Sequence, residues 1–216
     1  LELDLPINPY RGLWPFDEAD QPNFFGREKL INRLLARLGD IHDYGRFLAL
    51  VGARGVGKTS ILNAGLIPAL RNNLKGIDQQ WYIAQMTPGR SPLKQLQYAL
   101  ITLAQNTSLE TIKAELEQAE QPLASAVNKL LPDAEPLLLI IDQFEELFHV
   151  NVDPQERTAF LDIIREAASN TQGRIWIITA VRADYISRLL QVEGYGDLLQ
   201  QRTEFVLLLA PHELEK

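Results

Sequence analysis

An eight-residue loop, GARGVGKT at residues 52–59, carries the most specific chemistry in the sequence. It matches the pattern G-x-x-x-x-G-K-[ST] and lies between a continuous apolar stretch and a helical pattern, the setting in which this motif binds phosphate. Its glycines let the backbone close around phosphate oxygens, so that amide N–H groups point inward at the positive end of the following helix. Lys58 is predicted to reach the β- and γ-phosphates, and the Thr59 hydroxyl to take one position on Mg²⁺. The residues predicted to line this site for ATP or ADP are Gly52, Ala53, Arg54, Gly55, Val56, Gly57, Lys58 and Thr59.

A second motif, LLLIIDQFEELF at residues 137–148, supplies acids for the same chemistry. Asp142 ends the most apolar strand candidate and is the predicted carboxylate ligand of Mg²⁺. Glu145 and Glu146 follow at the next helical step, where a carboxylate can orient and deprotonate an attacking water. Gln143 cannot act as that base. The alternative interpretation of the glutamate pair is a solvated helix start that the helix dipole favours.

Arg182 is the third predicted catalytic residue. It lies in TAVRAD at residues 179–184, at the end of another strand candidate. Both Thr179 and Arg182 are expected at the carboxyl edge of the sheet, where ligands bind in open α/β folds. Arg182 is predicted to sense the γ-phosphate, and an ion pair with Asp184 is the alternative.

The segment FFGRE at residues 24–28 offers contacts to the other end of the nucleotide. Phe24 or Phe25 is placed to lie near an apolar base, and Arg27 to lie near ribose or phosphate. Packing of these aromatic residues in the core is an equally weighted alternative.

The periodicity of the chain predicts the elements that position these residues. Apolar runs indicate strands, and the 3.6-residue period together with capping residues such as Ser91, Asp153 and Asp184 indicates helices. Strands are expected over residues 46–51, 81–86, 137–141, 175–180 and 205–209. Helices are expected over residues 28–38, 93–105, 109–131 and 154–169, and after Asp184. Residues 6–25 are expected to form an irregular arm across the domain. Strands alternating with helices predict a three-layer α/β sandwich with a parallel sheet.

Composition excludes several classes of protein. The 216 residues are 46% apolar and 23% charged, which is typical of one globular domain. The net charge of −7 disfavours nucleic acid as a partner, and the longest aliphatic run, residues 137–141, is too short to cross a bilayer. The chain has no cysteine, and its three histidines never pair at metal-ligand spacing, so neither a disulfide nor a zinc site is expected. This usage suits a cytoplasmic protein.

Two other phosphate-binding enzyme classes fit the sequence less well. A GTPase needs an N-K-x-D base reader and a D-x-x-G switch, and neither pattern is present. A small-molecule kinase has no need of an acidic pair after Asp142.

Taken together, the motifs resemble the novel STAND group of signal-transduction ATPases, which are relatives of NACHT and AAA+ domains common in large bacterial proteins. The resemblance covers nearly the whole chain. The segments that carry it are NPYRGLWPFDEADQPNFFGRE, the P-loop with KTSILNAGLIPAL, TPGRSPL, DQFEELF and TAVRADYISRLL.

The resemblance implies a five-stranded P-loop NTPase sheet in the order 5-1-4-3-2. It implies phosphate contacts from Gly57 to Ser60, Mg²⁺ on Asp142, and a sensor role for Arg182. It also implies adenosine-side contacts from Phe25, Gly26 and Arg27. Many relatives carry an acid directly after the Mg²⁺ aspartate, and Gln143 departs from that pattern.

The chain is predicted to divide into an arm (residues 1–27), a P-loop NTPase core (28–210) and, as the resemblance implies, the start of a C-terminal lid helix (211–216). The chain is therefore expected to be cut from a larger signalling protein. In that protein, nucleotide state and slow ATP hydrolysis would control an effector. The protein would also contain the lid and a repeat array such as WD repeats, and its active state is expected to be a homo-oligomer. The alternative is a non-hydrolysing interaction module whose conformation is set by bound ADP or ATP.

Overall fold

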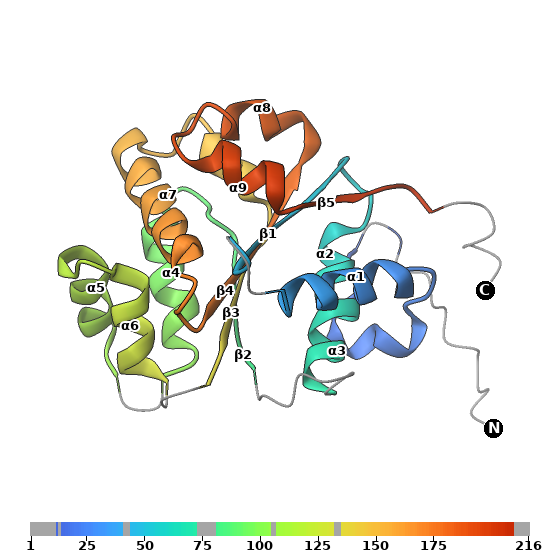
Figure 1. Cartoon of the computed structure of the whole chain (residues 1–216), viewed down its shortest axis with the longest axis horizontal. Helices are drawn as coiled ribbons and strands as arrows, with labels where there is room; N and C mark the ends of the chain where they lie inside the picture. Colours follow the sequence, from blue (N-terminus) through green and yellow to red (C-terminus); the bar gives the residue numbers. More distant parts are fainter. Residues whose placement is uncertain are drawn as a thin grey trace, which may run out of the picture.

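A five-stranded parallel sheet forms the centre of the molecule (Figure 1). The computed structural model describes residues 12, 14–40, 44–72, 81–104, 107–131 and 135–209. The strand order β2-β3-β4-β1-β5 confirms the predicted order 5-1-4-3-2. The strands are β1 (Phe47–Gly52), β2 (Tyr82–Met86), β3 (Leu137–Ile141), β4 (Ile175–Arg182) and β5 (Thr203–Val206).

Helices cover both faces of the sheet, so its central strands are buried on both sides (Figure 1). Along β1, Phe47 and Ala49 pack into one apolar cluster, whereas Leu48 and Leu50 pack into the other, because successive strand side chains point to opposite faces. One face carries α1 (Glu28–Leu38) and the helix that follows the P-loop. The other face carries α4 (Pro92–Ile101), α5 (Leu109–Gln118), α6 (Pro122–Leu130), α7 (Pro154–Ser169), α8 (Ile186–Leu189) and α9 (Tyr195–Gln201).

The helix after the P-loop contains a wide turn. It runs through α2 (Lys58–Ser60), the π-helical segment η2 (Ile61–Leu66) and α3 (Ile67–Arg71). The amide of Ile67 donates to the carbonyl of Leu62, five residues back. Pro68 follows directly, and its missing N–H and bulky ring disfavour the usual bond to the carbonyl four residues back. The wide turn therefore accommodates a proline in the helix.

The predicted helix over residues 109–131 is wrong as a single element, because it divides into α5 and α6. Gln121 precedes Pro122, and the proline ring pushes the residue before it out of the helical conformation. Helix α4 ends at Ile101 rather than at residue 105. Its predicted cap is also wrong, since the side chain of Ser91 makes no capping bond, and the amide of Leu93 is instead satisfied by Glu156 Oε1 at 3.2 Å.

The fifth strand begins and ends earlier than predicted, at Thr203–Val206 rather than over residues 205–209. Val206 pairs with Gly52, the last residue of β1. Because the chain turns into the P-loop after Gly52, no partner strand remains for residues 207–209. The predicted lid helix over residues 211–216 lies outside the described residues.

The N-terminal arm crosses the P-loop helix, and part of it is helical rather than irregular. A 3-10 helix, η1 (Glu18–Asn23), begins at the capping residue Asp17. The amide of Phe16 donates to Ser60 Oγ at 3.0 Å. Within the described residues, no helix is long and apolar enough to cross a membrane.

Candidate nucleotide-binding site

The loop between β1 and α2 has the backbone of a phosphate cradle. Gly55 and Gly57 have φ angles of +77° and +93°, a region that L side chains rarely adopt. A Cβ atom at either position would meet no atom within 4 Å, so this side of the loop is open. Gly52 is needed for a different reason, because its Cβ would lie 2.8 Å from Val56 Cγ1 and 2.9 Å from the carbonyl oxygen of Val206.

Lys58 is folded into this loop. Its ammonium Nζ donates to the carbonyl oxygens of Gly52 at 2.9 Å and Ala53 at 3.0 Å, and the residue is only 9% exposed. Burial lowers the pKa of the Lys58 ammonium, while the carboxylates of Glu145 and Asp142 oppose that shift. The predicted phosphate ligand therefore lies in the loop, close to the predicted acids.

Thr59 and Asp142, predicted separately as Mg²⁺ ligands, touch each other. Thr59 Oγ1 donates to Asp142 Oδ2 at 2.7 Å. The other carboxylate oxygen, Oδ1, accepts from the amide of Gln143 at 2.9 Å, and the Asp142 amide donates to the carbonyl of Met86. The fold thus joins the start of the P-loop helix to the end of β3.

This donor set fits Mg²⁺. No group of three or more His, Cys, Asp or Glu side chains gathers at metal-binding distance in the part of the chain that the structure describes. Mg²⁺ does not need such a group, since it is usually held by one or two protein ligands, with phosphate oxygens and water completing the shell. One hydroxyl and one carboxylate beside an open phosphate cradle meet that requirement.

The two glutamates have different partners. They lie in the 3-10 helix η3 (Phe144–Phe148), where Glu145 Oε2 accepts from the amide of Arg182 at 3.1 Å. Glu146 Oε2 accepts from the amide of Gly89 at 3.0 Å, in the loop between β2 and α4. Glu145 also raises the pKa of Lys58, and it does so more than Asp142 does.

Arg182 forms an ion pair with Asp184, as the alternative interpretation predicted. Its guanidinium donates from Nε to Asp184 Oδ1 at 3.0 Å and from NH2 to Oδ2 at 2.6 Å, and it lies over the ring of Tyr185. The hydrogen bond from Arg182 lowers the pKa of the Asp184 carboxyl. The prediction that Asp184 caps the following helix is wrong, because Asp184 lies inside the 3-10 helix η4 (Ala183–Tyr185) and the N-cap of α8 is Tyr185. The sensor role of Arg182 stays a prediction.

Thr179 is not at the edge of the sheet. Strand β4 continues to Arg182, so Thr179 lies inside the sheet between Ala49 and Ile141 and is 1% exposed. Its expected place at the carboxyl edge is therefore wrong.

Arg27 joins the arm to the nucleotide loop. Its NH2 donates to the carbonyl of Val56 at 3.1 Å, and its NH1 to the carbonyl of Leu207 at 2.8 Å. Phe24 is partly buried against the apolar cluster under α1 and packs on Phe16, with ring centroids 5.6 Å apart. Phe25, in contrast, is 56% exposed. Of the two aromatic residues, Phe25 is therefore the more accessible to a base.

Sequence reasoning missed a polar cavity beside the predicted Mg²⁺ ligands. This cavity of about 550 Å³ is lined by Thr59 and Asp142 and by amide side chains from three other elements. Two of these, Gln85 and Asn63, are hydrogen-bonded to each other at 2.8 Å. The amides come from separate elements and form no motif, so only their shared position after folding identifies them.

Comparisons with known proteins agree with this geometry. A family model described as Novel STAND NTPase 1 matches residues 9–216. No curated protein matches the chain.

Several solved structures have a similar fold. Cdc6p from Pyrobaculum aerophilum has a TM-score of 0.52 at 15% identity, over 94% of this chain and 48% of that one. ORC2 from Aeropyrum pernix, solved as ADPNP-ADP complexes, has a TM-score of 0.58 at 18% identity, and the match covers 84% of this chain and 46% of ORC2. ORC1 from Aeropyrum pernix, in complex with DNA, has a TM-score of 0.57 at 12% identity, and the match covers 89% of this chain and 48% of ORC1. The chain spans about half the length of these structures, and at such identities the likeness shows the fold alone.

Proposed function

The chain belongs to the novel STAND NTPase 1 family, and from that premise we propose that it binds ATP or ADP with Mg²⁺ and hydrolyses ATP slowly, as the nucleotide switch of a signalling protein. The observation that carries the proposal is the 2.7 Å contact between Thr59 and Asp142. It joins the two residues that hold Mg²⁺ in a P-loop NTPase at the mouth of an open glycine loop.

The residues of the site divide the work of phosphoryl transfer. The amides of residues 53–59 and the ammonium of Lys58 bind the phosphates. To do so, Lys58 leaves its hydrogen bonds to the carbonyls of Gly52 and Ala53 and donates to phosphate oxygens instead. Thr59 and Asp142 would hold Mg²⁺, which would offset the negative charge of the phosphates. Glu145 orients the attacking water and accepts its proton.

Slow turnover follows from how the arginine is held. An arginine placed on the transferring phosphate contributes about 10³ to 10⁵ in rate in P-loop enzymes. Here the Nε and NH2 groups of Arg182 both donate to the Asp184 carboxylate. We expect that pair to open before Arg182 reaches the γ-phosphate, and this requirement supports slow turnover.

The signalling role rests on the family. Within it, we place this cytoplasmic domain in a larger protein whose effector is controlled by nucleotide state, through a lid, a repeat array and a homo-oligomer of the active state. We propose no nucleic acid partner. The DNA in the ORC1 complex is a property of that protein, and the net charge of −7 opposes binding to phosphate backbones.

A non-hydrolysing nucleotide-dependent scaffold is the second candidate. The Arg182–Asp184 ion pair favours it, as does Gln143 in place of a second acid. Single-turnover measurements with excess protein separate the two functions, because a scaffold leaves ATP intact while a slow hydrolase converts it to ADP.

Lys58→Ala tests the nucleotide site itself. We expect it to abolish binding of Mg-ATP measured by calorimetric titration, because the polyphosphate loses its only buried cation in the loop. The circular dichroism spectrum should stay unchanged. Lys113→Ala, on the exposed side of α5, is the matched control and should bind ATP as the wild type does. Wild-type affinity in the Lys58 variant would remove the proposed site.

A further inference from the structure

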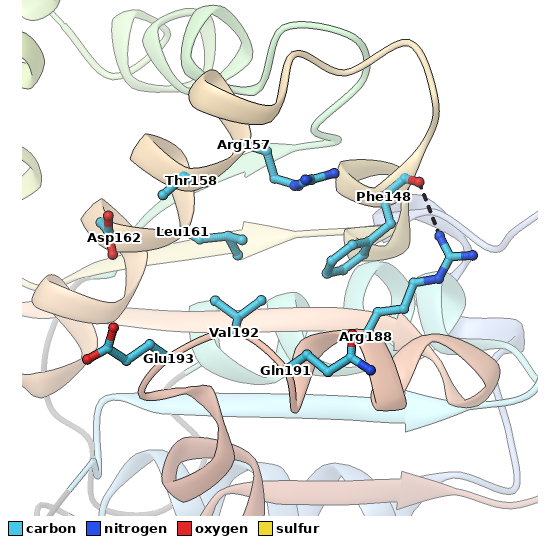
Figure 2. Close-up of a pocket in the computed structure, with 9 residues that line it drawn as sticks. All are labelled: Phe148, Arg157, Thr158, Leu161, Asp162, Arg188, Gln191, Val192 and Glu193. Atoms are coloured by element: carbon cyan, nitrogen blue, oxygen red, sulfur yellow. Dashed lines mark hydrogen bonds between the residues drawn. The ribbon is translucent and has the colours of Figure 1, made fainter.

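A second cavity lies away from the nucleotide loop, between α7, the end of η3 and the segment after α8 (Figure 2). Its volume is about 550 Å³, in the range of sites that hold drug-sized ligands. None of its lining residues belongs to the proposed nucleotide or Mg²⁺ contacts. The proposed function leaves this cavity unexplained.

One end of the cavity carries two guanidinium groups, which contact aromatic rings and a backbone carbonyl rather than carboxylates. Arg157 lies over the ring of Phe148, 5.8 Å from its centroid. Arg188 donates from NH1 to the carbonyl of Phe148 at 3.3 Å and lies 5.1 Å from the ring centroid of Tyr185. Among the described residues, neither arginine forms a salt bridge. Both are therefore oriented in advance and keep N–H donors for a ligand.

The opposite end is acidic, and the wall between the ends is apolar. Figure 2 shows Asp162 and Glu193 on one side of the cavity and Arg157, Arg188 and Phe148 on the other, with Leu161 and Val192 between them. Asp162 is paired with Arg165 at 2.9 Å, which offsets part of its charge. A ligand that fits this lining is anionic at one end, apolar in the middle and cationic at the other end.

We propose that this cavity is a docking site for a short extended segment of a partner protein. The segment places an acidic side chain on Arg157 and Arg188, an apolar side chain on Phe148 and Leu161, and a basic side chain towards Glu193. Guanidinium groups match carboxylates in planar, charge-assisted pairs. A nucleotide or another polyphosphate is disfavoured because its charge meets the acidic end.

Two capped tripeptides test this site in the full chain without nucleotide. The charged probe is N-acetyl-Glu-Leu-Lys amide, and the neutral control is N-acetyl-Gln-Leu-Gln amide. Amide chemical shifts from ¹⁵N NMR report where each one binds. We expect the charged peptide to shift the amides of η3, α7 and α8, with an affinity at least about tenfold above that of the neutral peptide, the effect of one or two charge-assisted hydrogen bonds.

Variants locate the effect. The double substitution Arg157→Gln and Arg188→Gln should remove the tenfold preference, whereas Arg33→Gln, an exposed arginine on α1 across the sheet, should keep it. Three results would each overturn the proposal. They are equal affinities of the two probes, no shift up to about 10 mM peptide, roughly ten times the dissociation constant of millimolar binding, and tighter binding of inorganic phosphate at these amides. These outcomes do not depend on ATP binding, so the proposal of a docking site and the proposal of a nucleotide site are tested separately.

Discussion

At the residue scale, the two glutamates after β3 are close in sequence but differ in their surroundings. Glu145 accepts from the amide of Arg182 and opposes the lowering of the Lys58 pKa by burial, whereas Glu146 accepts from the amide of Gly89 in the loop before α4. We expect Glu145→Gln to keep ATP affinity and lose turnover, since removal of a base affects the transition state more than the ground state.

Glu146→Gln is the matched comparison for that prediction. Its amide oxygen can still accept from Gly89, so turnover should fall much less than in the Glu145 variant. Single-turnover rates and calorimetric affinities, measured on both variants, distinguish them. Full activity of the double variant would show that the base lies elsewhere.

Asp184 sets how available Arg182 is. In Asp184→Asn the bidentate ion pair is lost, and the guanidinium of Arg182 becomes free to reach a γ-phosphate. We expect the ratio of ATP affinity to ADP affinity to rise about threefold, a modest change because exposed ion pairs are weak. Competition binding with both nucleotides measures this ratio. In the background of Arg182→Gln the same substitution should change nothing, and an equal rise there would contradict a role for Arg182.

At the scale of elements, the P-loop helix is positioned by a close approach to α1 and the arm. A Cβ on Gly65 would lie 2.6 Å from Ile31 Cδ1, 2.9 Å from Ile31 Cγ1 and 3.3 Å from Phe24 Cε1. Gly65→Ala should therefore lower the free energy of unfolding by about 1 to 3 kcal/mol through overpacking. Urea denaturation monitored by circular dichroism tests this prediction.

Gly196 provides the control for that substitution. It lies in α9, and its added Cβ would meet no atom within 4 Å. Gly196→Ala should raise the free energy of unfolding by up to about 1 kcal/mol, because alanine is the better helix former. If both variants changed stability in the same direction, the close approach at Gly65 would not be the cause.

At the scale of the whole molecule, the nucleotide site draws on both ends of the chain. Arg27 bonds to the P-loop at Val56 and to Leu207 beyond β5. Mg-ADP at about one hundred times its dissociation constant should stabilise the fold by about 2.7 kcal/mol. For a chain of this size, that corresponds to a rise in Tm of about 5 to 10 °C.

Thermal unfolding with and without Mg-ADP checks this shift. The Lys58→Ala variant should show none, which separates specific binding from a general effect of the ligand. A wild-type Tm that does not move at any ADP concentration would contradict nucleotide binding by this fold.

Features that depend on neighbours along the chain could be predicted from local pattern. The glycine loop, the helix from Glu28 to Leu38 and the apolar strand before Asp142 follow from local pattern, and the structure has all three. Alternation of strands and helices determined the parallel three-layer architecture, since each crossover needs a helix to cover the sheet. The 5-1-4-3-2 order came from the family resemblance.

Features that depend on contacts between distant residues could not be predicted in this way and are known from the folded molecule. The tertiary structure placed Thr179 inside the sheet and ended β5 at Val206, where β1 turns away. It also gave Glu145 a partner at the end of β4 and Glu146 a partner in the loop before α4. It also brought Arg157 and Arg188 to one cavity from separate helices. Sequence spacing gives the face or edge on which a side chain lies, but its partner is set by packing and charge among elements that meet only when the chain folds.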